Sequence, residues 1–176
     1  MSKGNVVSRN DPAAAGDRRA GAGSPPLARP MLFPGGVQPS DLTRRPRVLV
    51  AEDDAEMRRL VADALRKDGY DIVEESDGGR LLVRIAAIYS FRRTSDPVDL
   101  IVSDVRMPVC SGLDILKGLR DAHWQTPVIL MTAFGDAETR ARAESLGAHL
   151  FDKPFTMQAL RAKVRELLDT QAGKES

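Results

Sequence analysis

The sequence has a single cysteine and no long apolar run. Because Cys110 stands alone among 176 residues, an internal disulfide is impossible, which agrees with a reducing cytosol. No apolar stretch approaches the roughly 18 residues needed to cross a membrane. The amino terminus also lacks the apolar segment of a secretory signal peptide. We therefore expect a cytoplasmic protein that makes no membrane contact.

The sequence also lacks a strong net charge, since its formal charge is only +1. Its charges are unevenly spread, however: residues 1–47 hold eight basic and three acidic residues, which leaves the remainder with a net charge of −4. An acidic body behind a basic leader is not typical of a compact DNA-binding domain, so no direct binding to nucleic acid is expected. The length suggests one domain, and the 42% hydrophobic content suffices for a normal core.

Residues 1–46 differ in composition from the rest of the chain. They are rich in Ala, Gly, Ser and Arg and hold seven of the eleven prolines. Such a segment buries too little apolar surface to offset its chain entropy. We expect a disordered leader at residues 1–46, a folded domain at 47–170 and a short tail at 171–176. A short apolar patch at residues 31–33 is suited to docking on a partner or on the domain.

From Arg47 onwards, short apolar segments alternate with segments of helical periodicity. The expected strands are residues 47–51, 70–75, 98–103, 127–131 and 149–151. The expected helices are residues 55–68, 81–88, 113–119, 137–146 and 156–168, with Asp54 and Thr156 as amino-terminal caps and Gly69 ending the first. Five strands alternating with five helices predict an α/β fold, with a parallel sheet covered by helices on both faces.

Polar residues follow four of the expected strands, where ligands bind in an open α/β sheet. These residues are Glu52, Asp53 and Asp54 after the first strand, Asp104 after the third, Thr132 after the fourth and Lys153 after the fifth. Carboxylates gathered at one rim repel each other, so either a pKa rises or a cation resides there. Oxygen ligands in an open, hydrated site suit Mg²⁺.

A cation beside a carboxylate, with a lysine and a hydroxyl opposite, is an arrangement for phosphoryl transfer. Asp104 is the candidate nucleophile and would form an acyl phosphate. The metal and Lys153 would neutralise the phosphoryl oxygens, and Thr132 would hydrogen-bond to one of them. The sequence thus predicts a phosphoacceptor site at this rim.

Four motifs in order carry a resemblance to a known family. They are VLVAEDD at 48–54, IVSDVRMP at 101–108, VILMTA at 128–133 and DKPF at 152–155, each closing an expected strand. Residues 47–170 thereby resemble the receiver domain of two-component response regulators. The resemblance implies a flavodoxin-like, doubly wound sheet of five parallel strands in the order 2-1-3-4-5 with five helices.

The resemblance also implies a role for each site residue. Asp53 would bind Mg²⁺ directly and Glu52 through water, while Asp104 and the backbone carbonyl of Arg106 would complete the protein ligands. Asp54 would then be a helix cap and not a ligand.

The remaining roles concern the phosphoryl group itself. Asp104 would be the phosphoacceptor, Thr132 the switch hydroxyl and Lys153 the partner of the phosphoryl group. The Lys153–Pro154 bond would be cis. The phosphoryl donor would be a sensor histidine kinase or a phosphotransfer protein. A downstream protein would bind the face of the fourth helix, fifth strand and fifth helix. The protein would not be an enzyme, although it would assist its own phosphorylation and dephosphorylation.

One departure from the family pattern concerns the readout of the signal. The family usually has Tyr or Phe three residues before the lysine, and this sequence has Leu150. An aromatic readout at Leu150 is therefore not available, and the candidate substitutes for it are the nearby rings of Phe134, His149 and Phe151.

A second departure concerns the water path to the phosphoryl group. The two positions that flank this path are occupied by Arg106 and Phe134, which are both bulky. Because bulky groups there hinder the attacking water, we expect slow autodephosphorylation.

Three functions are compatible with these motifs. Because only eight residues follow Leu168, we expect a stand-alone receiver and no DNA-binding output domain. An alternative is a phosphorylation-independent interaction module of the same fold. The intact site argues against this alternative, and Leu150 argues mildly for it. A third hypothesis is a Mg²⁺-dependent phosphatase with an Asp nucleophile, but such enzymes typically carry a second Asp where Arg106 stands.

Overall fold

The structure is a computed structural model that describes residues 44–90 and 97–173. The expectations for residues 1–43 and 174–176 lie outside the described residues. The elements, in chain order, are β1 (Arg47–Ala51), α1 (Ala55–Lys67), β2 (Asp71–Glu75), α2 (Gly78–Ser90), β3 (Leu100–Asp104), α3 (Gly112–Asp121), β4 (Val128–Thr132), α4 (Ala137–Ser145), β5 (His149–Asp152) and α5 (Met157–Ala172).

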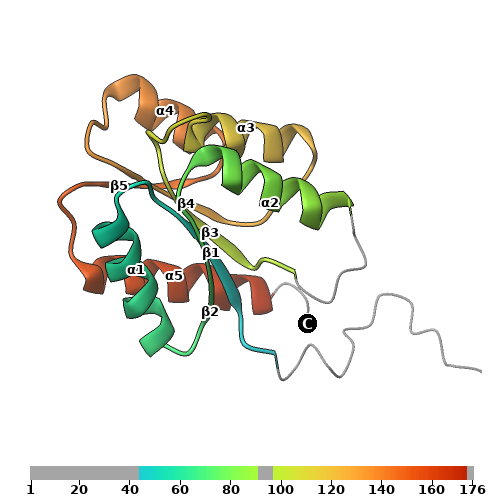
Figure 1. Cartoon of the computed structure of the whole chain (residues 1–176), viewed down its shortest axis with the longest axis vertical. Coiled ribbons are helices and arrows are strands. Elements are labelled where there is room, and N and C mark those ends of the chain that lie inside the picture. Colours follow the sequence, from blue (N-terminus) through green and yellow to red (C-terminus); the bar gives the residue numbers. More distant parts are fainter. Residues whose placement is uncertain (1–43, 91–96, 174–176) are drawn as a thin grey trace, which may run out of the picture. The chain divides into compact units, whose positions relative to one another are not determined.

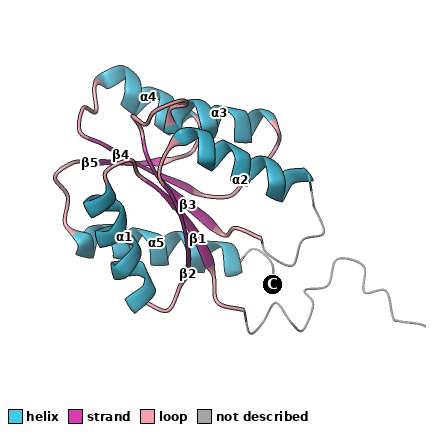
Figure 2. Cartoon of the chain, viewed as in Figure 1, coloured by secondary structure: helices cyan, strands magenta, loops and turns pink. Residues whose placement is uncertain are grey.

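The five strands form one parallel sheet in the order β2-β1-β3-β4-β5. Helices α1 and α5 cover one face, and α2, α3 and α4 cover the other (Figure 1). The ribbon coloured by secondary structure shows the same three layers (Figure 2). The expected α/β fold and its strand order are confirmed. Among the described residues, no helix combines the length and the apolar character that crossing a membrane requires.

Alternating residues of the central strands supply two separate cores. Val48 and Val50 of β1 pack with residues of α1 and α5, whereas Leu49 and Ala51 pack with residues of α2 and α3. The period of two along a strand sends neighbouring side chains to opposite faces. All five residues of β3 and of β4 are buried. This double burial explains why both strands begin with continuous apolar runs, LIV in β3 and VILM in β4.

Side-chain caps begin the helices that follow β1 and β5. The carboxylate of Asp54 accepts the Met57 amide at 2.8 Å, and the hydroxyl of Thr156 accepts the Ala159 amide at 3.1 Å. Both expected caps are confirmed. Gly69, with a φ of 93°, follows α1 in a left-handed conformation that favours glycine. Several strands begin or end a residue or two from their expected limits, because hydrogen bonding at the ends of elements is irregular.

Candidate functional site

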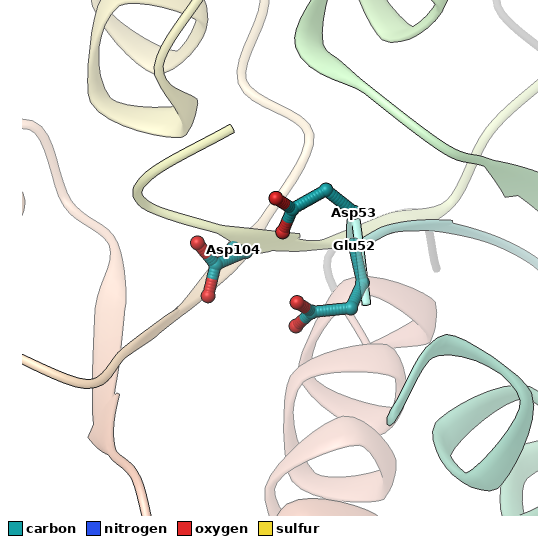
Figure 3. A group of neighbouring side chains, drawn as sticks. All are labelled: Glu52, Asp53 and Asp104. Atoms are coloured by element: carbon teal, nitrogen blue, oxygen red, sulfur yellow. The ribbon is translucent and has the colours of Figure 1, made fainter. Parts of the chain in front are cut away.

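Three carboxylates meet at the carboxyl ends of β1 and β3. Glu52 and Asp53 follow β1, and Asp104 is the last residue of β3. One oxygen from each of the three side chains lies within 4.8 Å of the others (Figure 3). Glu52 and Asp104 are buried, whereas Asp53 is exposed to solvent. The cluster is therefore open on one side and closed on the other.

Lys153, which follows β5, joins two of these carboxylates. Its ammonium nitrogen lies 2.6 Å from Glu52 Oε2 and 2.6 Å from Asp104 Oδ1. The backbone amide of Lys153 donates to the carbonyl of Thr132 at 2.7 Å, which ties the residue to the end of β4. The Lys153–Pro154 peptide bond is cis, as the resemblance implied.

Burial and the contacts between Lys153 and the carboxylates act in opposite directions on the pKa values of Glu52 and Lys153. Burial raises the pKa of Glu52 above its ordinary value, and the nearby charge of Asp104 adds to this effect. The hydrogen bond from Lys153 lowers the pKa of Glu52 but does not cancel the rise. For Lys153, burial opposes the charged form, but the hydrogen bonds to Asp104 and Glu52 outweigh it and raise its pKa. The lysine is therefore held in its charged form between two carboxylates.

Backbone contacts fix the position of Asp104. Its Oδ2 accepts the amide of Arg106 at 2.6 Å, and its carbonyl accepts the hydroxyl of Ser103 at 3.0 Å. Gly112, at the start of α3, lies directly over this carbonyl, and a Cβ at this position would clash with the carbonyl oxygen. The glycine thus allows α3 to begin in contact with the strand that carries Asp104.

The hydroxyl of Thr132 is buried and is held by the loop after β4. Its Oγ1 accepts the amide of Phe134 at 3.1 Å. Phe134 is 67% exposed as a residue, and the guanidinium carbon of Arg106 lies 4.0 Å from the centroid of its ring. Arg106 and Phe134, the two bulky residues expected to flank the water path, are therefore in contact with each other.

The ring of Phe151 lies on the other side of the sheet from Leu150. Leu150 packs against the core beneath α2 and α3. Phe151 packs against the core beneath α1 and α5, and its ring contacts His149 with centroids 4.9 Å apart. Of the three rings considered as a replacement at Leu150, only that of Phe134 lies in the loop that contacts Thr132.

Two residues that support the site were not predicted from the sequence. The guanidinium of Arg58 in α1 donates to the carbonyl of Glu52 at 2.7 Å and lies 3.6 Å from the carboxylate of Glu74. Gly112 provides the close approach to Asp104. A glycine directly before an apolar helical segment is a signal of close packing, but Arg58 resembles the other arginines of its helix.

The residues present fit a hard divalent cation. Carboxylate oxygens, with water completing the shell, are the ligands that Mg²⁺ prefers, and the cluster contains no sulfur or imidazole ligand that would favour a softer metal. The structure brings Glu52, Asp53, Asp104 and Lys153 together, with Thr132 on the neighbouring strand. The site places the positive charge of Lys153 directly beside the buried carboxylate of Asp104, an arrangement suited to nucleophilic chemistry at a phosphoryl group.

Comparison with known proteins agrees with this geometry. A family model described as the response regulator receiver domain matches residues 48–165. The transcriptional regulatory protein CpxR of Escherichia coli K12 is 35% identical over 123 residues, which are 69% of this chain and 49% of CpxR. The chain thus spans about half the length of this curated relative.

Solved structures show the same fold. The receiver domain of the Francisella response regulator 1452 has a TM-score of 0.64 and 29% identity, covering 72% of this chain and 99% of that one. The response regulator TrrA of Thermotoga maritima, solved in complex with Mg²⁺ and BeF, has a TM-score of 0.58 and 28% identity, covering 69% of this chain and 98% of that one. The chain therefore belongs to the response regulator receiver domain family of two-component signalling.

Proposed function

We propose that this chain accepts a phosphoryl group on Asp104 in a Mg²⁺-dependent reaction and changes its partner-binding surface in response. The observation that carries the proposal is the position of Asp104, which lies 2.6 Å from the Lys153 ammonium and within the carboxylate cluster. A lone structural aspartate would need neither the lysine nor two further carboxylates beside it. The similar protein TrrA was solved in complex with Mg²⁺ and BeF, and this complex supports the same interpretation.

In the proposed reaction, an Asp104 oxygen forms a bond to phosphorus. The bond between phosphorus and the donor's histidine nitrogen breaks, and its electron pair returns to the imidazole. Glu52, Asp53, Asp104 and the Arg106 carbonyl would hold Mg²⁺, which supplies positive charge to the phosphoryl oxygens when bound. Lys153 would move its contact from Asp104 Oδ1 to a phosphoryl oxygen.

The proposed donor is a sensor histidine kinase or a phosphotransfer protein, and the proposed output is a downstream protein. Its binding surface would be the face of α4, β5 and α5. Support for this face comes from burial: α4 has Ala143 as its one buried residue, and β5 is an edge strand.

We further propose that the chain acts in the cytoplasm and is no enzyme beyond assisting its own phosphorylation and dephosphorylation. That the receiver works without an output domain stays a prediction. The mass of the protein isolated from its own cells tests it.

The first test is incubation of the protein with acetyl phosphate and Mg²⁺, followed by intact mass measurement. We expect a mass gain of one phosphoryl group that is lost in Asp104→Asn and on chelation of Mg²⁺. Asp121→Asn, which changes an exposed aspartate of α3 paired with Lys117, is the matched control and should phosphorylate normally. If wild-type protein gains no mass, the phosphorylation-independent interaction module, which Leu150 favours, replaces this proposal.

A further inference from the structure

The Arg106–Phe134 contact joins the two loops that border the phosphoacceptor. Arg106 follows β3 and Phe134 follows β4, so their contact bridges neighbouring strands at the rim of the sheet. The guanidinium carbon of Arg106 lies 4.0 Å from the ring centroid of Phe134, a residue that is 67% exposed. A cation held over an aromatic face is attracted by the negative charge of that face. An exposed ring is thereby given a defined partner.

Each residue of this contact is also bound through its backbone to the site. The amide of Arg106 donates to Asp104 Oδ2 at 2.6 Å. The amide of Phe134 donates to the hydroxyl oxygen of Thr132 at 3.1 Å. One residue is therefore bonded to the proposed phosphoacceptor, and the other to the hydroxyl beside it. A rearrangement at either group changes a hydrogen bond of the contact pair.

We propose that the Arg106–Phe134 contact is a latch that reports the phosphorylation state of Asp104. The inference rests on the proposed function. When Asp104 carries a phosphoryl group, the Thr132 hydroxyl leaves the Phe134 amide and donates to a phosphoryl oxygen. Asp104 Oδ2, which accepts the Arg106 amide, becomes the oxygen that bridges carbon and phosphorus, and it is then a weaker acceptor than a carboxylate oxygen. Both backbone anchors change together, and the ring separates from the guanidinium.

Contacts of the residues after Phe134 connect the latch to α4 and to the end of β5. Gly135 follows Phe134 and lies beside the carboxylate of Asp152 at the end of β5, where a Cβ would meet Asp152 Oδ1. The other oxygen of that carboxylate accepts Arg140 of α4 at 2.7 Å. Asp136, the cap of α4, has its pKa lowered by the Thr139 amide and hydroxyl and further by Arg106. The latch therefore adjoins the first turns of α4 and the end of β5.

The test compares nuclear magnetic resonance spectra of the protein before and after phosphorylation by acetyl phosphate with Mg²⁺. The ring current of Phe134 shifts the side-chain protons of Arg106 upfield, and we expect this shift to fall by more than half on phosphorylation. In Phe134→Ala and Arg106→Met, the amide shifts of residues 137–145 should change less than half as much as in wild type at matched phosphate occupancy. Phe134→Trp keeps an aromatic face for Arg106, so the amide shifts of residues 137–145 should change as much in this variant as in wild type.

A matched control is Val83→Ala, which truncates the side chain of a residue of α2 that is 71% exposed. It should leave the response of residues 137–145 as in wild type. The latch is wrong if Phe134→Ala and Arg106→Met both respond fully at matched occupancy. It is equally wrong if the Arg106 ring-current shift persists in the phosphorylated protein.

A separate measurement on unphosphorylated protein distinguishes the latch from the proposed function. Thr132→Val removes the acceptor of the Phe134 amide while keeping the shape of the side chain. We expect the ring-current shift of Arg106 to decrease in this variant even without phosphate. If wild-type protein gains no phosphoryl mass but this decrease is seen, the proposed function fails and the coupling stands. An unchanged shift in Thr132→Val overturns the coupling whatever the phosphorylation result.

Discussion

At the scale of single residues, the site is a balance between buried charges. Lys153 lies between Glu52 and Asp104 and offsets their repulsion. The raised pKa of Glu52 shows that burial is the larger influence on that carboxyl. Functional sites commonly retain such costs because the same charges are needed for binding or chemistry.

Glu52 should make the fold less stable as pH rises. Because its pKa is higher in the folded state than its ordinary value of 4.5, the folded protein binds the proton more tightly. This contribution is fully present below pH 4.5 and is lost as pH rises through the folded-state pKa. Glu52→Gln should therefore raise the free energy of unfolding near neutral pH in the absence of metal. Urea unfolding at acidic and at neutral pH measures the difference, and a variant less stable than wild type at neutral pH would contradict the prediction.

Arg106 and Phe134 should slow hydrolysis of the acyl phosphate. Both side chains still flank the water path after their mutual contact has opened, and a steric barrier of about 0.5–1 kcal/mol on that path slows the reaction about two- to fivefold. We expect Phe134→Ala to shorten the phosphoryl lifetime by about this factor, as followed by intact mass after removal of the donor. Hydrolysis of the wild-type phosphoprotein within seconds would show that neither side chain hinders the water.

At the scale of elements, the start of α3 is placed by one close contact. Gly112 lies against the carbonyl of Asp104, whereas a Cβ at Gly118, later in the same helix, would meet nothing within 4 Å. The same residue type therefore has two different effects within one helix. In the first position it permits packing, and in the second it only weakens the helix.

Substitution of these two glycines should have opposite effects. In Gly112→Ala, strand and helix must separate, which should cost about 1–3 kcal/mol and slow phosphorylation of Asp104. In Gly118→Ala, the new methyl group meets open space, and helix propensity should add up to about 1 kcal/mol. Urea unfolding and the rate of mass gain from acetyl phosphate check both. Equal effects of the two changes would argue against the packing role of Gly112.

At the scale of the whole molecule, the site lies at the carboxyl ends of strands that have a separate core on each face of the sheet. The two cores on either side of the sheet hold β1, β3 and β4 in register, and this register brings residues distant in sequence to one rim. Lys153 and Glu52, for example, are 101 positions apart and in direct contact. Binding at the rim is therefore coupled to the stability of the entire domain.

Addition of Mg²⁺ should stabilise the domain against unfolding. At a concentration roughly 100 times the dissociation constant, the gain is about 2.7 kcal/mol. Asp53→Asn should abolish most of this gain because it removes a proposed ligand. Asp54→Asn is the matched control, since Asn caps a helix about as well as Asp and Asp54 is the cap of α1. Thermal unfolding with and without Mg²⁺ distinguishes the two variants. If only Asp54→Asn loses the stabilisation by Mg²⁺, then Asp54 and not Asp53 is the ligand.

The fold class, the order of the elements and the residues at each strand end could all be predicted from the amino-acid chain. Apolar periodicity and the helix caps Asp54 and Thr156 are local properties, so they can be recognised without a structure. The rule that parallel strands present their carboxyl ends at one rim then predicts that Asp104 and Lys153 meet, and the structure shows this contact.

The way in which these residues are held could not be predicted and depends on tertiary packing. The contact between Arg106 and Phe134, the bond from Phe134 to Thr132 and the support of Glu52 by Arg58 join groups whose spacing in the sequence carries no signal. Side-chain direction and loop geometry depend on packing between elements, which no local pattern encodes. The meeting of these residue types at one rim was therefore predictable from the sequence. The contact proposed as a latch, in contrast, became visible only when the folded sheet brought the loops after β3 and β4 together.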